Sequence, residues 1–254
     1  MREALRLARL YLLSPSQAAE AARREENFRP NLQLYLAFVA ATMVFFAVKP
    51  FDFPDTSAVL PRAGADPLFW LKTALFQPPL EAAWIVSLMG LVCWLRGGSL
   101  PVRLAVAVAW AASPFILMAA YSSPNMGMGK LLFAALSLLW AAAYYPLLRG
   151  LSRQDWLPLA SFMLGVNVIG VALIPLMTVA VLARSAGAFT TVQALGGLWM
   201  LGVGTLGLRQ LTGLRLPRAF MALLFSMVFQ IAVAFTLHLL GIVPKDILKA
   251  LLYA

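Results

Sequence analysis

The fold is decided by residues 84–103, WIVSLMGLVCWLRGGSLPVR, in which an apolar run breaks at a basic, glycine-containing turn and a second apolar run begins. Residues 199–218 have the same organisation, and Arg103 and Arg218 in the two turns are 115 positions apart. Each stretch predicts two membrane-spanning helices joined by a short turn. A parallel duplication, as in some transporters, and two unrelated hairpins of the same topology both explain the likeness. The stretch therefore indicates orientation in a bilayer and no chemistry.

The composition is that of an integral membrane protein. The 254 residues are 62% hydrophobic and 12% charged, whereas soluble domains have about half and about a quarter. The net charge of +10 does not indicate a nucleic-acid partner, because the placement of the basic residues explains it. The single cysteine, Cys93, lies in an apolar run and excludes a disulfide framework.

Seven apolar stretches have 16 to 25 residues, which matches or comes within one residue of the about 17 to 25 helical residues that cross the hydrocarbon core. They are predicted at 32–48, 80–95, 104–121, 131–148, 158–182, 192–208 and 219–241. We therefore expect an all-α fold, a polytopic transmembrane helical bundle of about seven spans. Residues 32–254 form the transmembrane domain, and residues 1–31 form a region of short amphipathic helices at the membrane surface.

Thirteen of the 20 lysines and arginines fall at one predicted end of the spans. They are Arg2, Arg6, Arg9, Arg23, Arg24, Arg29, Arg96, Arg103, Arg149, Arg153, Arg209, Arg215 and Arg218. An excess of positive charge in short loops marks the cytoplasmic side. The amino terminus is therefore predicted to lie inside.

The amino-terminal region carries a basic stripe. Arg2, Arg6 and Arg9 recur at helical spacing in the segment 1–13, among several leucines. This pattern is typical of a helix in the headgroup layer, with its arginines on anionic lipid. The sequence Ser-Pro-Ser-Gln at 14–17 then predicts a hydroxyl-capped helix from 15 to about 26.

The segment between the first two predicted spans has two parts. Residues 49–67 contain three aspartates and several prolines and are predicted to form an ordered loop outside the cytoplasm. Residues 69–76 are too short to cross the membrane, and they contain Trp70 and Lys72, which favours the membrane interface. Pro78 and Pro79 are expected to set the angle at which the second span enters.

Four polar residues in the predicted spans form a candidate intramembrane polar site. Glu81 is the only acid in a predicted span, in the first turn of 80–95 near the outer surface, and His238 lies in the same leaflet. Ionisable groups at depth are candidates for function, so a Glu81–His238 contact is one expectation. The alternative is two interfacial side chains that reach headgroups or Lys72. Asn167 and Gln230, near the middle of their spans, are expected to hydrogen-bond across helices.

The sequence contains no nucleotide-binding loop, metal-ligand cluster, nucleophile constellation or paired carboxylates. Gly202, Gly204 and Gly207 have the spacing of a dinucleotide fingerprint, but they lie inside a predicted span without a preceding strand, which that motif requires. We therefore predict no catalytic residue, no cofactor and no metal.

Several short motifs resemble the Yip1-domain family of membrane proteins in its bacterial type. They are YLLSPSQAA at 11–19, NFRP at 27–30, the turn GGSLPVR at 97–103 followed by Ala112-Ser113-Pro114, and TGLRLPRA at 212–219. The resemblance implies a polytopic helical protein with a cytoplasmic amino terminus, no known catalysis and a place in the bacterial cytoplasmic (inner) membrane. The two crossings around 131–182 and the missing long amino-terminal domain depart from the family pattern, so no GTPase-binding role is transferred.

Three functions are weighed. The first is a non-enzymatic membrane protein of Yip1 type that organises membrane or scaffolds partners, with anionic lipid headgroups and a membrane protein or a second copy of this chain as partners. The second is a small transporter or permease-like subunit with a cavity near Glu81, Asn167, Gln230 and His238. The third, an intramembrane enzyme acting on lipid, lacks a nucleophile and base and ranks last.

Overall fold

The computed structural model describes residues 2–50, 53 and 67–253, and all regular elements in these ranges are helical. The helices are α1 (Arg2–Leu13), α2 (Pro15–Ala22), η1 (Glu25–Asn27), α3 (Phe28–Val48), α4 (Pro67–Leu95), α5 (Leu100–Ser122), α6 (Lys130–Ala142), α7 (Tyr145–Leu148), α8 (Arg153–Val166), α9 (Val168–Leu182), α10 (Ala186–Thr212), α11 (Leu216–Leu239) and α12 (Lys245–Tyr253). Within the described residues, seven helical stretches are long and apolar enough to cross a membrane. The prediction of an all-α polytopic bundle of about seven spans is confirmed.

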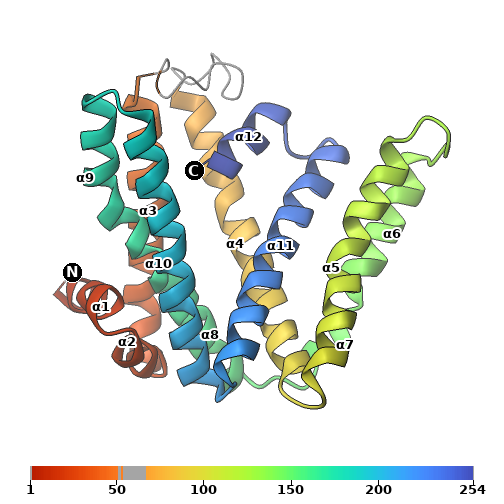
Figure 1. Ribbon diagram of the computed structural model, residues 1–254, viewed down its shortest axis with the longest axis horizontal. Helices are drawn as coiled ribbons and strands as arrows, with labels where there is room; N and C mark the ends of the chain where they lie inside the picture. Colours follow the sequence, from red (N-terminus) through yellow and green to blue (C-terminus); the bar gives the residue numbers. More distant parts are fainter. Residues whose placement is uncertain (1, 51–52, 54–66, 254) are drawn as a thin grey trace.

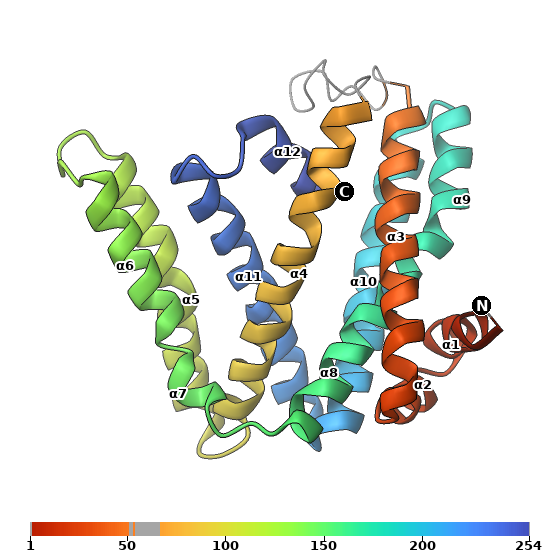
Figure 2. The ribbon, with the colours of Figure 1, turned by 180° about the vertical axis from the view of Figure 1, so that it is seen from behind.

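The spans form a body and a hairpin (Figures 1 and 2). In the body, α3 packs against α8 and α9, α10 packs against α9 and α11, and α4 packs most extensively against α11. The hairpin of α5 and α6 attaches to α11 and α4, and its far end leans away from the body in Figure 2. Helices α1 and α2 lie across the lower part of the body in Figure 1, against α8 and α10.

Helices α4 and α11 form the centre of the body. Leu88 and Leu95 on α4 are fully buried. The indole N–H of Trp84 donates to the hydroxyl of Ser226 on α11 at 2.8 Å. Because the bilayer core holds no water, a buried donor there needs a protein acceptor, and the Ser226 hydroxyl provides it. The bond also fixes the register of the two helices.

The second span begins earlier than predicted. Residues 69–76 belong to α4, which runs without interruption from Pro67 to Leu95 and holds Pro78 and Pro79 in its interior. Trp70 is buried and stacks on Phe46 of α3, with ring centroids 5.8 Å apart. The prediction of a separate interfacial segment before the second span was therefore wrong, because these residues continue the helix of that span.

The fifth span consists of two helices. Helix α8 begins at Arg153, earlier than the predicted 158, because the Asp155 carboxylate accepts hydrogen bonds from the Ser152 N–H at 2.9 Å and the Ser152 hydroxyl at 2.8 Å. Helix α8 ends before Asn167 and α9 begins after it. The predicted continuous helix over 158–182 is therefore interrupted at Asn167.

The amino-terminal boundaries also differ from the predictions. Helix α2 ends at Ala22, and the Ser14 side chain makes no capping hydrogen bond. Helix α3 begins at Phe28 with Pro30 in its first turn, where a missing N–H costs nothing. The proposed border between residues 31 and 32 thus falls inside α3. Most of the predicted outer loop, 51–52 and 54–66, lies outside the described residues.

Candidate functional site

Glu81 and Asn167 meet inside the body. The Asn167 side-chain amide donates to a Glu81 carboxylate oxygen at 3.0 Å, and the two residues are 5% and 4% exposed. Glu81 is the fifteenth of the 29 residues of α4, so it lies at the middle of the helix. Its expected position near the outer surface was wrong, because the predicted span began 13 residues too late. An ionisable group at such depth is costly and needs a partner, which Asn167 provides.

Asn167 also holds the break between α8 and α9. Its amide lies within hydrogen-bond reach of the Met163 carbonyl at 3.0 Å and the Leu164 carbonyl at 3.4 Å, both in the last turn of α8. The side chain therefore links a helix end to the carboxyl group on α4. The prediction that Asn167 bonds across helices is confirmed.

Gln230 lies beside this pair, whereas His238 lies apart from it. The Gln230 amide donates to the Leu80 carbonyl at 3.5 Å, a long bond from α11 to α4 next to Glu81. The His238 ring nitrogen Nδ1 is 2.8 Å from the Val243 carbonyl oxygen, beyond the end of its own helix. Between the described residues no hydrogen bond or ion pair joins Glu81 to His238. The structure thus brings Glu81, Asn167 and Gln230 to one region and places His238 in a local turn.

Polar side chains on α3 extend this region toward the basic end. Asn31 donates to the Ser161 hydroxyl of α8 at 2.8 Å, and both are buried. Tyr35 lies one turn further along α3 and is also buried. These residues were not predicted as part of the site. Asn31 and Tyr35 are four residues apart on α3, a spacing that places both on one helix face. This spacing was the sequence pattern that could have identified them.

Helix α1 presents its arginines away from the body. Leu7 and Tyr11 are fully buried, whereas Arg2, Arg6 and Arg9 are exposed on the opposite face. Arg6 pairs with Glu3 at 2.9 Å in an exposed contact. The amphipathic pattern that favoured a helix in the headgroup layer therefore has a second cause, because the apolar face packs against protein.

Tyr11 anchors α1 on α8. Its ring lies 5.4 Å from that of Phe162 and against Gly165, where a side chain would collide with the phenol. Burial raises the pKa of the Tyr11 phenol well above its usual range, so this group stays neutral at physiological pH. The anchor fixes the direction of the arginine face.

Three other arginines of the predicted cytoplasmic end bind helix carboxyl termini. Arg218 donates to the carbonyls of Leu95 at 2.7 Å and Gly98 at 2.8 Å. Arg103 donates to the Trp94 carbonyl. Arg23 donates to the Gln210 and Leu211 carbonyls at the end of α10, at 3.0 and 3.2 Å. These carbonyls lack partners within their own helices, so these side chains stabilise the fold as well as marking one face.

The 84–103 and 199–218 stretches therefore touch. Arg218 of the second turn binds the backbone of the first, over Leu95 to Gly98. Gly213 ends α10 with a φ of 71°, a left-handed conformation that glycine adopts without strain. The contact gives Arg218 a structural role, whether or not the stretches share an origin.

No group of three or more histidine, cysteine, aspartate or glutamate side chains that could hold a metal ion occurs within 2–50, 53 and 67–253. Comparison with models of known protein families, with curated proteins and with solved structures finds no match for this chain.

Proposed function

We propose that this multi-pass membrane protein is a non-enzymatic, Yip1-type protein that gathers anionic lipid or scaffolds partners at the bacterial cytoplasmic membrane, with its amino terminus inside. The observation that carries the proposal is the fixed basic face of α1. Leu7 and Tyr11 hold the helix on the body while Arg2, Arg6 and Arg9 stay exposed. A preformed array of charges binds without the entropic cost of ordering it.

The surroundings of α1 support an anchored platform. Helix α2 packs four buried alanines, at positions 18, 19, 21 and 22, against α10. Arg23 and Glu20 both bond to α10, the latter by accepting from Gln210 at 3.2 Å. Exposed Leu5 and Leu13, at 66% and 70%, lie beside the arginines. Leucine side chains flanking basic residues are typical of helices that enter the headgroup layer.

The test measures lipid selectivity around α1 in the full-length protein. A donor dye is placed at Leu13→Cys in a Cys93→Ser background, and the protein is reconstituted with headgroup-labelled phosphatidylglycerol or phosphatidylethanolamine. We expect more energy transfer to phosphatidylglycerol, since each arginine near an anionic surface contributes about 1 kcal/mol. The difference should shrink as salt is raised, because exposed charges are screened.

Two matched triple variants distinguish the position of the arginines from the total positive charge of the protein. Replacing Arg2, Arg6 and Arg9 together with glutamine should abolish the preference. Replacing Arg24, Arg209 and Arg215 with glutamine removes the same charge from the same end and should leave the preference in place. Equal transfer to the two lipids in the unmodified α1 would refute the proposal.

The Glu81–Asn167 contact favours a second candidate, a small transporter or permease-like subunit. Its support is a buried carboxyl group bonded to the residue where a membrane helix breaks, an arrangement that secondary transporters use at their binding sites. Proteoliposomes with a pH-sensitive dye would test it under an imposed pH gradient. A proton leak that Glu81→Gln abolishes and His238→Ala preserves supports transport, and equal dye traces for all three proteins argue against it.

A further inference from the structure

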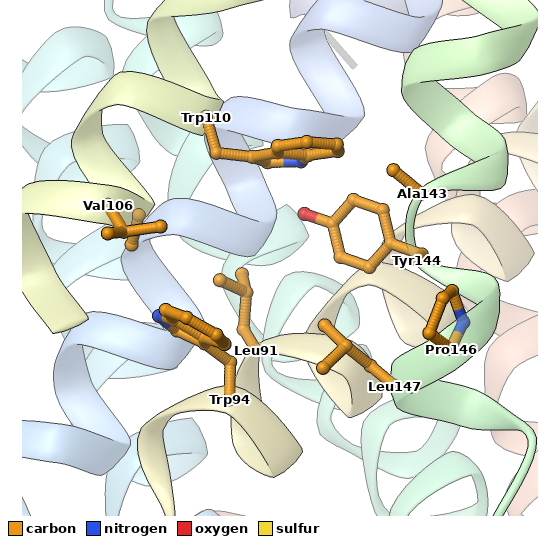
Figure 3. Close-up of a pocket in the computed structure, with 9 residues that line it drawn as sticks. Leu91, Trp94, Val106, Trp110, Ala143, Tyr144, Pro146 and Leu147 are labelled. Atoms are coloured by element: carbon orange, nitrogen blue, oxygen red, sulfur yellow. The ribbon is translucent and has the colours of Figure 1, made fainter. Parts of the chain in front are cut away.

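A pocket of about 270 Å³ lies between the body and the hairpin, on the basic half of the molecule. Helices α4, α5 and the α6–α7 turn supply its walls, and Figure 3 shows Trp94, Trp110, Tyr144 and Leu147 around one space. The lining is almost entirely apolar. This pocket takes no part in the Glu81 region or in the α1 surface.

The chain builds this pocket from a break in a predicted span. Helix α6 ends at Ala142, four residues before Pro146, whose missing N–H leaves that carbonyl without its helical bond. Ala143 and Tyr144 form the turn before α7. The Tyr144 ring packs closely on Gly90 of α4, so the turn is held against the body while space remains beside it.

The deep end of the pocket is rigid. The Trp110 ring packs edge-on against Tyr144, with centroids 5.8 Å apart, and stacks on Trp140 at 6.2 Å. The Trp140 N–H donates to the Trp110 carbonyl at 3.3 Å. These ring contacts and the hydrogen bond hold in place the aromatic side chains that line the deep end of the pocket.

The shallow end of the pocket is basic. The Arg103 guanidinium lies 4.7 Å from the centre of the Trp94 ring that lines the pocket. Arg103 and Trp94 are both half-buried, so this guanidinium lies at the mouth of the pocket. Its positive charge makes this part of the rim basic.

We propose that the pocket binds one acyl chain of an anionic phospholipid, whose headgroup lies beside Arg103. The volume is below the 300–1,000 Å³ typical of sites that enclose a whole ligand, so it accommodates a chain and leaves the headgroup outside. Arg103 and Trp110 are seven residues apart on α5, which is about 10 Å along the helix. This depth stays within one leaflet of a hydrocarbon core of about 30 Å.

The chemistry of the site selects this occupant. The aromatic and aliphatic lining offers nothing to a polar solute, and the arginine at the rim favours a headgroup with a net negative charge over a zwitterionic one. The inference shares its lipid partner with the proposed function but uses a different surface. Replacement of Arg2, Arg6 and Arg9 should therefore leave this lipid bound.

Native mass spectrometry of the detergent-solubilised full-length protein tests the chain site. With phosphatidylglycerol supplied, we expect one lipid retained per chain. Ala143→Phe fills the pocket and should lower the retained fraction at least tenfold. Ala142→Phe adds the same bulk at the exposed preceding residue, which does not line the pocket, and should retain the lipid. Equal retention in both variants, or none in the unmodified protein, overturns the proposal.

Separate variants test whether the pocket rim recognises the lipid headgroup. Arg103→Gln should remove the preference for phosphatidylglycerol over phosphatidylethanolamine, and Arg209→Gln, at the same end but on α10, should keep it. Glycerol 3-phosphate without chains should not displace the lipid. Displacement by that soluble phosphate, or equal retention of the two lipids in the unmodified protein, contradicts the assignment.

A second measurement needs no pocket-filling variant. Phosphatidylglycerol with brominated chains quenches tryptophan fluorescence at short range, so titration of the unmodified protein should give a saturable loss of signal. Trp110→Phe should remove a large part of that saturable component. Quenching that rises linearly without saturation, or is the same in Trp110→Phe, shows lipid only at the general surface and overturns the proposal.

Discussion

Helix α4 and the span formed by α6 and α7 are both apolar enough to cross a membrane, yet α4 is mostly buried inside the protein and the α6–α7 span is mostly exposed. The α4 stretch has a mean hydropathy of 1.5 and is 61% buried inside the protein, whereas the α6–α7 stretch has 1.8 and is 11% buried. The more apolar of the two is the more exposed. Lipid tails are as apolar as leucine, so hydrophobicity brings a helix into the membrane but does not bring it to the protein core.

Polar groups and close packing distinguish the central helix. Helix α4 carries the buried Glu81 and Ser87, and its Trp84 bonds to α11. The hairpin instead presents leucines outward, with Leu131 at 88% and Leu138 at 71% exposure. Trp84 and Glu81 find their hydrogen-bond partners on other helices, and these contacts help to select which helices meet.

The largest contrast is expected for one substitution made in both helices. Leu88→Ala in α4 removes a fully buried side chain and should cost about 3 kcal/mol of unfolding free energy. Leu138→Ala in α6 should change it by less than about 0.5 kcal/mol, because that side chain faces the surroundings of the protein. Denaturant unfolding in mixed micelles measures both. Similar losses would mean that the hairpin packs against something as tightly as α4 does.

Loss of Arg218 is expected to have the next largest effect. Arg218→Gln removes a charged donor from carbonyls at the end of α4 and should cost about 2 kcal/mol, in the range of hydrogen bonds to charged groups. Arg215→Gln, in the same turn and exposed, is the control and should stay close to the unmodified protein. An unchanged stability in Arg218→Gln would reduce its role to topology alone.

The smallest effect is predicted at the contact between hairpin and body. Trp140→Leu keeps an apolar side chain but removes stacking on Phe229, at 4.5 Å, and a hydrogen bond to Trp110. The expected loss is about 1 kcal/mol. Limited proteolysis of the 123–130 turn together with unfolding would show whether the hairpin loosens before the body does. Simultaneous loosening would mean that the two are one cooperative unit.

Span number and helical class were predictable because length and apolarity report directly on membrane crossing. The start of α4 was not, since Trp70 and Lys72 are typical of an interface and two prolines follow. The structure resolves the conflict by packing Trp70 on Phe46, while Pro78 and Pro79 lie on the exposed side of α4. That outcome depends on a neighbouring helix, which local pattern does not contain.

The candidate site was predictable in its residues and not in its pairing. Glu81 and Asn167 stand out as polar residues in apolar runs, and both belong to the buried contact. Their pairing depends on α4 lying beside α8, a tertiary contact between segments 86 residues apart. His238 was the only histidine and attracted attention by rarity, but its ring bonds within the turn after α11.

The packing position of Tyr11 on α8 has a consequence for the order of events during synthesis of the protein. Its partners Phe162 and Gly165 lie some 150 residues later in the chain, and ribosomes add about 5 to 20 residues per second. For roughly 8 to 30 s the amino-terminal helix is therefore synthesised but has no docking site. During that interval the bilayer surface is the available partner for the leucines and arginines of α1. The helix then exchanges lipid for protein on its apolar face, and insertion of α8 becomes the event that completes the amino terminus.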